Sequence, residues 1–393
     1  MNQMNMFDAK ENAKIGMAKR LLQGEAEEKA LVQKVAAMVI QDKLVPPLAT
    51  QFGILSMGEL EKDFRFSLRI SYPGLQDQKI HRHAMGQLCQ KVELPISFAN
   101  KLSAEKELWK LSLLQHNLNE LFHKTEWKEQ KSGPTRFLHR IVDGELRGFL
   151  SRRYNRYLAS RPLLQAFAEQ ARMMGARPVE GTYTDVRVAL KYLFPEAIEV
   201  FPGEFVGIGT EWSNSDFGAG KLTVCQTIWR LKTQSSSVLD ESISRVHLGS
   251  IIEDSDIEMS DETAQKEVSA LQSAIRDAVS YQLATDTMER MIVAIRAAHD
   301  EQVPWTKLRG LLGRFLSKAD VAWVKGVLDG TGATVVDLPP VSFSPEGERV
   351  PNLWWASSAV SSIAQATSDL DKKLELQRAA GALLSKSVPT PES

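Results

Sequence analysis

Two carboxylates enclose a polar stretch near the middle of the chain, and this arrangement is the first that could support chemistry. Glu211 and Asp216 flank residues 212–215, which read Trp-Ser-Asn-Ser. A pair of carboxylates can do acid–base work or hold a divalent cation. The same residue types also form polar turns, because Asn and Ser side chains cap nearby backbone groups. Both interpretations are open from the sequence.

Motifs for phosphates, metals and nucleophiles are incomplete. Residues 218–221 have the form of the end of a phosphate-binding loop, but Ser215 and Leu222 stand where the pattern requires Gly and Ser or Thr. His81 and His83 offer two imidazoles, yet no cysteine or carboxylate nearby completes a set of metal ligands. The Gly-x-Ser-x-Gly motif of a nucleophile elbow and the zincin motif, which would indicate an enzyme, are both absent from the sequence. We expect no cofactor, no metal and no catalytic residue.

Positive charge is concentrated in one part of the chain. Residues 124–191 contain fourteen basic and seven acidic residues, although the whole chain has a net charge of −1. The densest cluster runs from Arg147 to Tyr157, where aromatic residues alternate with arginines. Such a surface can hold phosphates with arginine forks and stack bases on aromatic rings. A solvated basic face, or ion pairs with the acidic stretch at residues 253–262, is the alternative.

This cluster is the predicted nucleic-acid-binding site. Arginine and lysine side chains would hold phosphates, and the two tyrosines would stack on bases. The predicted contact residues are Arg136, Arg140, Arg147, Arg152, Arg153, Tyr154, Arg156, Tyr157 and Lys221.

Length and composition bound the class of protein. A chain of 393 residues is long enough for two or more packed units. The two cysteines, Cys89 and Cys225, exclude a disulfide framework and a four-thiolate zinc site. No apolar run is long enough to span a membrane, and residues 1–19 lack the apolar core of a signal peptide. We expect a protein of the host cytoplasm with no membrane partner.

The residue patterns predict an α+β fold. A helix is expected over residues 8–41, and strict alternation predicts a strand over 64–72. Asp143-Gly144 indicates a hairpin turn between strands at 136–142 and 145–151, because these residues tolerate positive φ angles. A helix at 161–174, strands at 181–193, 204–211 and 221–233, and helices from 262 to 384 follow.

This order of elements predicts a central, mostly antiparallel sheet with one inserted helix, flanked by N-terminal and C-terminal helices. The expected domains are an N-terminal helical region with one or two strands over residues 1–130 and a β-rich core over 131–240. A C-terminal helical region over 241–386 and a loose tail at 387–393 complete the chain.

Three segments together resemble a known family. They are residues 148–154 (Gly-Phe-Leu-Ser-Arg-Arg-Tyr), residues 212–220 (Trp-Ser-Asn-Ser-Asp-Phe-Gly-Ala-Gly) and residues 245–249 (Arg-Val-His-Leu-Gly). The chain is similar over about residues 145–384 to the phage- and plasmid-associated family with domain of unknown function 932, whose end also resembles residues 352–356. The family pattern of Thr-Asn-Gly after the strand is absent at residues 233–235.

The resemblance implies a role in the DNA metabolism of mobile elements. We therefore expect a non-catalytic protein that binds single-stranded DNA, with possible annealing or recombination activity and assembly into homo-oligomers. One alternative is an interaction protein that binds a host or phage protein through its C-terminal helices, with Trp354 and Trp355 as anchors. The two tryptophans could instead pack in the core. The remaining interpretation is a metal-dependent enzyme that uses Glu211 and Asp216.

Overall fold

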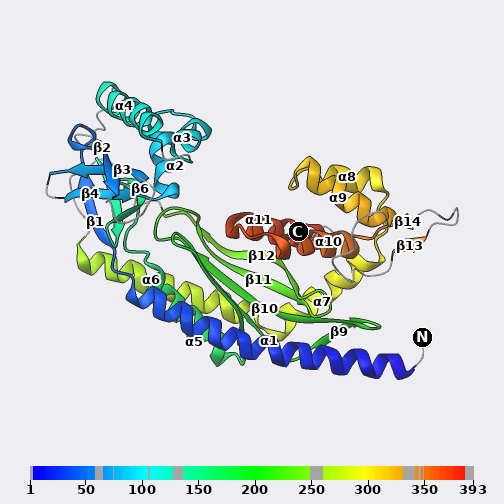
Figure 1. The fold of residues 1–393 in the computed structure, drawn as a ribbon. Coiled ribbons are helices and arrows are strands. Elements are labelled where there is room, and N and C mark those ends of the chain that lie inside the picture. Colours follow the sequence, from blue (N-terminus) through cyan, green and yellow to red (C-terminus); the bar gives the residue numbers. More distant parts are fainter. Residues whose placement is uncertain are drawn as a thin grey trace, which may run out of the picture.

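Two six-stranded, largely antiparallel sheets and the helices that cover them form the protein, which confirms the expected α+β class. The computed structural model describes residues 3–57, 65–73, 75–104, 107–125, 127, 136–247, 260–330, 341–343, 347 and 349–385. Figure 1 shows one sheet at the upper left and the other in the centre, with the long first helix below the central sheet.

The N-terminal lobe, residues 41–151, follows the long helix α1 (Gln3–Ala37). Its strands are β1 (Gln41–Val45), β2 (Gln51–Met57), β3 (Arg65–Tyr72), β4 (Leu75–Ile80), β5 (Phe137–Val142) and β6 (Glu145–Ser151). A short 3-10 helix, η1 (Pro47–Ala49), precedes β2, and three α-helices follow β4: α2 (Arg82–Lys91), α3 (Ile96–Ala104) and α4 (Leu108–Lys124). The sheet order is β1-β5-β6-β4-β3-β2, and helices α2 and α4 pack against it.

Local sequence explains much of this lobe. Leu68, Ile70 and Tyr72 alternate along β3 and are buried against the helices, as period-two patterning predicts. Asp143 and Gly144 have φ angles of 50° and 74°, which are the positive values that a two-residue hairpin turn requires.

The central sheet begins after helix α5 (Ser160–Met173). Its strands are β7 (Arg177–Tyr183), β8 (Val188–Leu193), β9 (Ile198–Phe201), β10 (Glu204–Asn214), β11 (Leu222–Arg230) and β12 (Ser235–Arg245). The order is β12-β11-β10-β8-β7, with β9 paired to β10. Helices α5, α6 (Asp261–Gln282) and α7 (Thr285–Asp300) pack on one face, and α1 lies along β7.

The remaining helices cover the far end of the central sheet. They are α8 (Trp305–Leu312), α9 (Lys318–Asp329), α10 (Leu353–Ala366) and α11 (Leu370–Ser385), with a two-stranded hairpin of β13 (Ser342–Phe343) and β14 (Arg349–Val350) before α10. Trp354 and Trp355 on α10 are 0% and 1% exposed. The pair therefore belongs to the core, and its use as an interface anchor is wrong.

The structure groups the strands differently from the single central sheet expected. The hairpin of β5 and β6 pairs with β1 and β4, so it belongs to the N-terminal lobe. Strands β1, β2, β4, β9, β12, β13 and β14 were not expected, and the single strand expected at 181–193 is two strands, β7 and β8. Polar sequences such as that of β4 form strands only when a neighbour supplies the hydrogen bonds. The tail at 387–393 lies outside the described residues.

Among the described residues, no helix is both long enough and apolar enough to cross a membrane.

A buried histidine lies in the core of the N-terminal lobe. His139 on β5 is fully buried, with its ring centroid 5.0 Å from that of Tyr72 and 4.9 Å from that of Phe149. Neither ring nitrogen has a hydrogen-bond partner among the described residues. Burial therefore lowers the pKa of His139 to about 3, because the charged imidazolium would lose its hydration.

This histidine should make the lobe sensitive to mild acid. The unfolded chain takes up a proton near pH 6.5 and the folded chain only near pH 3, so stability falls as pH is lowered between these values. At pH 5 this residue lowers the free energy of unfolding by about 2 kcal/mol relative to neutral pH. We expect His139→Phe to reduce the loss of unfolding free energy between pH 7.5 and pH 5 by that amount, measured by urea denaturation. Exposed His116, changed to Gln, is the control, and equal losses in both variants would contradict the assignment.

Candidate nucleic-acid interface

The segments that carry the family resemblance meet at one place in the fold. The turn after β6, the loop at residues 214–220 and residues 245–247 after β12 converge where the N-terminal lobe contacts the central sheet. We call this place the joint. Hydrogen bonds of the joint engage several of the residues predicted to bind nucleic acid.

Arg140 is the central cation of the joint. It is 4% exposed, its Nε donates to Asp42 Oδ1 at 2.9 Å, and its guanidinium donates to the Asp216 carbonyl oxygen at 2.5 Å. Burial raises the pKa of the Asp216 carboxyl, while the charge of Arg140 opposes that effect. The carboxylate Oδ1 of Asp216 accepts the backbone N–H of Ser160 at 2.8 Å, at the start of α5. Arg140 is thus committed to internal partners.

Tyr154 also has an internal partner on each side. Its ring stacks on that of His247, with centroids 5.2 Å apart, and the Arg140 guanidinium lies 5.6 Å from its centroid. The hydroxyl donates to the Ser215 carbonyl oxygen at 2.8 Å. Since both the ring and the hydroxyl have partners within the protein, base stacking on Tyr154 would require the joint to open.

His247 and Asn214 complete the joint beneath this tyrosine. The Nε2 of His247 lies 2.6 Å from Asn214 Oδ1, and the amide nitrogen of Asn214 donates to Ser160 Oγ at 3.1 Å. Burial lowers the pKa of His247 to about 4, so the ring is neutral near pH 7. Asn214 thus links the start of α5 to the segment after β12. Residues 212–215, which could have formed an active site, have a structural role here.

The loop at residues 215–220 is held from both sides. Ser215 Oγ donates to the Val186 carbonyl oxygen at 2.7 Å and accepts the backbone N–H of Ala219 at 2.8 Å. From helix α2, Gln87 donates to the Phe217 carbonyl oxygen at 2.9 Å, and His83 Nε2 lies 3.1 Å from the same oxygen. His83 therefore belongs to the joint and not to a metal site.

Many cations of the basic segment are paired with carboxylates from distant parts of the chain. Residues of α1, β1, β10 and α11 supply these partners, at distances of 2.5 to 3.3 Å. The pairs are Arg140–Asp42, Arg172–Glu28, Arg177–Glu25, Arg187–Asp371 and Lys191–Glu211. All five carboxylates lie outside residues 124–191, so they compensate five of the seven excess charges. The basic segment of the sequence is therefore not an equally basic surface.

The other predicted contact residues lie at the rim of the joint. Arg136 and Arg153 are exposed, and Arg152 is half-buried. Arg147 is held by Glu145, whose carboxylate accepts from its Nε at 3.3 Å. Interaction partners also exist for Arg152 and Arg153.

Arg156, Tyr157 and Lys221 complete the predicted set. The Arg156 guanidinium donates to the Tyr157 hydroxyl at 3.3 Å and lies 5.3 Å from the centroid of its ring. Tyr157 packs on the core of the central sheet, and Lys221 Nζ donates to Ser244 Oγ at 2.5 Å on β12. Lys221 lies directly before β11 of the central sheet, whereas the arginines lie on β5 and β6 or next to these strands, so the predicted set is divided between two parts of the fold.

Glu211 belongs to a buried network instead of a carboxylate pair with Asp216. Its carboxylate lies 3.3 Å from Lys191 Nζ, which also donates to Glu180 at 2.7 Å and to Gln377 at 3.1 Å. Burial opposes ionisation of Glu180, but Lys191 and Lys373 outweigh it and lower its pKa to about 2. Among the described residues, no group of three His, Cys, Asp or Glu side chains could hold a metal ion.

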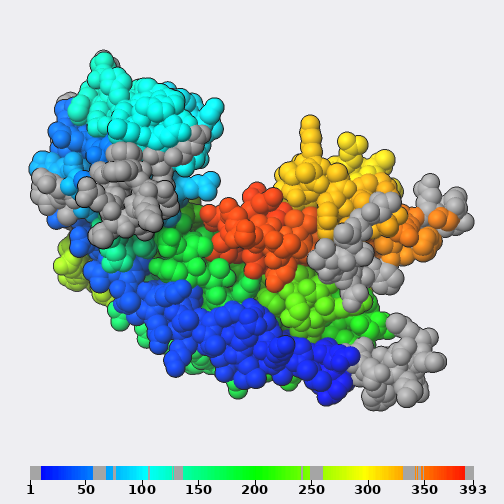
Figure 2. Space-filling model, viewed as in Figure 1, coloured from blue at the N-terminus to red at the C-terminus, as the bar shows by residue number. Residues whose placement is uncertain are grey.

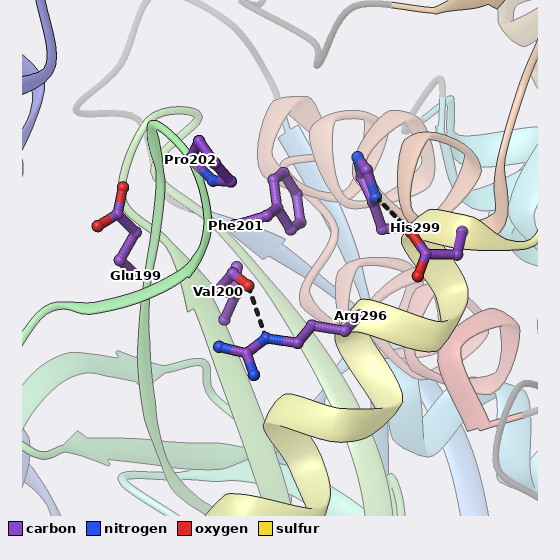
Figure 3. A pocket seen from close by; sticks show the side chains of 7 residues that line it. Glu199, Val200, Phe201, Pro202, Arg296 and His299 are labelled. Carbon is purple, nitrogen blue, oxygen red and sulfur yellow. Dashed lines mark hydrogen bonds and ion pairs between the residues drawn. The ribbon is translucent and has the colours of Figure 1, made fainter. Parts of the chain in front are cut away.

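Figure 3 shows a hollow of about 570 Å³ between the β9–β10 hairpin and the end of α7. The His299 ring lies against Phe201, with centroids 4.1 Å apart, and Arg296 Nε donates to the Val200 carbonyl oxygen at 2.8 Å. The carboxylates of Glu199 and Asp300 also line it. Because one guanidinium and two carboxylates line it together, this hollow points to no single class of charged ligand.

Helix α8 and the turn after it present cations of a different kind. Lys307, Arg309, Arg314 and Lys318 are all exposed, and none forms an ion pair with a described residue. Residues 305–318 contain no Asp or Glu. Four uncompensated cations on fourteen residues are the electrostatic footprint expected of a phosphate-binding surface. The absence of acidic residues from this run is the sequence signal that could have pointed to the surface, and it was not used in the prediction.

Comparisons with protein-family models, with curated proteins and with solved structures found no match to this chain.

The joint should depend strongly on Arg140. Arg140→Ala leaves Asp42 and the Asp216 carbonyl without their buried cation, and we expect a loss of about 3–5 kcal/mol of unfolding free energy. Arg136 is exposed and directly precedes β5, so Arg136→Ala should change the unfolding free energy by less than about 0.5 kcal/mol. Urea denaturation of both variants measures the difference. A loss below about 1 kcal/mol for Arg140→Ala would show that the joint does not rest on this cation.

Proposed function

We propose that this protein binds nucleic acid through the surface formed by α8 and the start of α9. The observation that carries the proposal is the contrast between two groups of cations. Five cations of residues 124–191 are paired with distant carboxylates, whereas Lys307, Arg309, Arg314 and Lys318 have no such partner among the described residues. Phosphate binding releases counterions from nucleic acid and needs cations that are free to approach it.

The position of these cations supports the proposal. Helices α8 and α9 lie beyond α10 and α11, at the end of the molecule opposite the N-terminal lobe (Figure 1). Figure 2 shows a hollow between that lobe and the α8–α9 region, with α11 at its floor. A nucleic acid that approaches the end of the molecule would meet α8 without displacing another element.

The experiment is a salt titration of binding to a fluorescent oligonucleotide. We expect neutralisation of Lys307, Arg309 and Arg314 to Gln to weaken binding about tenfold or more at ~0.1 M salt. The slope of log affinity against log salt should fall by about 3, since each lost phosphate contact contributes about 0.9.

Two matched triple variants complete the design. Arg82, Lys91 and Lys101 are exposed on the N-terminal lobe, and their change to Gln removes the same charge without touching α8. The third triple changes Arg152, Arg153 and Arg156 to Gln and tests the site predicted from sequence. If that triple alone reduces the salt slope, the interface lies beside the joint, as the sequence suggested. If wild type does not bind at low salt, the proposed function is wrong.

A second candidate function, protein association, rests on an apolar patch of the N-terminal lobe. Ile96 and Phe98 on α3 and Leu108, Trp109 and Leu113 on α4 are each 38–62% exposed, and the two helices are neighbours. Clusters of this kind on soluble surfaces mark contact sites. The expected homo-oligomer would have such a contact.

Sedimentation velocity tests this patch directly. We expect wild type to sediment as an oligomer and the variant Leu108→Ser/Trp109→Ser to sediment as a smaller species, because the apolar contact area is lost. Val39→Ser, which changes another exposed apolar residue of the chain, should leave the sedimentation unchanged. Identical sedimentation of wild type and the double variant would exclude the patch as a contact between copies.

A further inference from the structure

The turn between α8 and α9 presents one aromatic side chain to solvent. Phe315 is 37% exposed, and its ring makes no contact with another aromatic ring or a cation of the described residues. The other two aromatic residues of α8 and α9 are engaged. Trp305 is half-buried, with the Lys325 ammonium 5.2 Å from its ring centroid, and Trp323 is half-buried against the core. Of the three rings in residues 305–329, Phe315 has the one that is open to a ligand.

The backbone of the turn fixes the direction of this ring. The N–H groups of Phe315 and Leu316 donate to the Leu312 carbonyl oxygen at 3.0 and 2.9 Å, so the backbone stays coiled past the end of α8. Leu312 and Leu316 are buried in one core cluster. On the other side of the turn, Ser317 caps α9 by accepting the backbone N–H of Asp320 at 3.2 Å. Phe315 is therefore held in place before a ligand arrives, which lowers the entropic cost of binding.

The ring also lies within the run of cations at residues 305–318, which contains no Asp or Glu. Arg314 directly precedes Phe315, Lys318 follows it three residues later, and both cations are exposed. On α8, a side chain at Gly310 would meet nothing within 4 Å, so the helix surface is open there as well. Proteins that bind single strands combine cations that follow the phosphates with aromatic rings that stack on the bases. Phe315 supplies the second of these components to a surface that already has the first.

We propose that this surface binds single-stranded nucleic acid, with one base stacked on Phe315 and the flanking phosphates held by Arg314 and Lys318. The inference rests on the proposed function and deepens it by naming the form of nucleic acid. The bases of a single strand can separate and stack on an aromatic ring. In a duplex each base is stacked on its neighbours, so a base would have to be flipped out before it could reach Phe315.

This stacking site differs from the one predicted from the sequence. Tyr154 is stacked on His247, and Tyr157 packs on the core of the central sheet. Either tyrosine would have to leave its partner before it could take a base. Phe315 can accept a base without any such rearrangement, because its ring has no partner to leave.

The test measures binding of the full chain to three fluorescent probes of one length: a DNA strand, its duplex, and a strand that lacks the bases. The strand without bases keeps the phosphates but cannot stack. At ~0.1 M salt we expect the complete strand to bind about tenfold more tightly than the strand without bases, which is within the range for stacking of one base. The complete strand should also bind more tightly than the duplex.

Two substitutions of one residue separate the ring from its bulk. Phe315→Leu keeps an apolar side chain but no stacking face, and it should weaken binding of the complete strand about tenfold. Binding of the strand without bases, and the salt slope, should be unchanged because no charge is lost. Phe315→Tyr keeps the ring and should bind as wild type does. Tyr281→Leu removes an aromatic ring that is 52% exposed on α6 and should have no effect.

The outcomes separate this inference from the proposed function. Duplex binding that equals or exceeds binding of the complete strand, with the α8 triple variant still weakened, would overturn the single-strand inference and leave nucleic-acid binding in place. Equal affinity of wild type and Phe315→Leu for the complete strand would overturn the stacking site. No binding to any of the three probes at low salt would end both proposals.

Discussion

The buried guanidinium of Arg140 is the interaction on which the arrangement of this protein depends. It lies between the N-terminal lobe and the central sheet, where water cannot solvate it, and it contacts Asp42 and the backbone of the loop at residues 214–220. A charge in such a place is tolerated only when hydrogen bonds replace its hydration. The Asn214, Tyr154 and His247 contacts around it form the same network, so the two sheets meet at a polar joint and not across an apolar interface.

The joint also explains why glycine and small polar residues are dense at residues 212–220. The loop passes close to β6 and to α2, and a side chain at Gly218 would run into Leu150 and Gln87. Gly218 itself has φ of 75°, which an L-residue with a side chain rarely adopts. A sequence that has the form of a ligand-binding loop is here a close-packed crossing of chain segments, with its backbone groups bonded to neighbouring side chains.

The distribution of charge follows the same logic across the molecule. Cations of the basic segment meet carboxylates that are far away in sequence, from α1 at one end to α11 at the other. These pairs fix helices to the sheets, and they leave the basic segment close to neutral in space. The cations on α8 and the turn after it have no such partners among the residues that the structure describes. We therefore propose a binding function for the smaller group of cations, on α8 and the turn after it. The larger group, in residues 124–191, has a structural role in these ion pairs.

The sequence by itself determined features that depend on neighbouring residues. The alternation along β3 and the Asp143-Gly144 turn follow from local periodicity and turn chemistry, and they are confirmed. The assignment of the β5–β6 hairpin to the first sheet, the polar strands β4 and β12 and the burial of Arg140 and Tyr154 were decided by tertiary structure. Strand pairing and ion pairing join residues that are tens to hundreds of positions apart, and local patterns do not encode the partner. For the same reason, the count of charges along the chain located the basic residues but not the surface where their charge remains uncompensated.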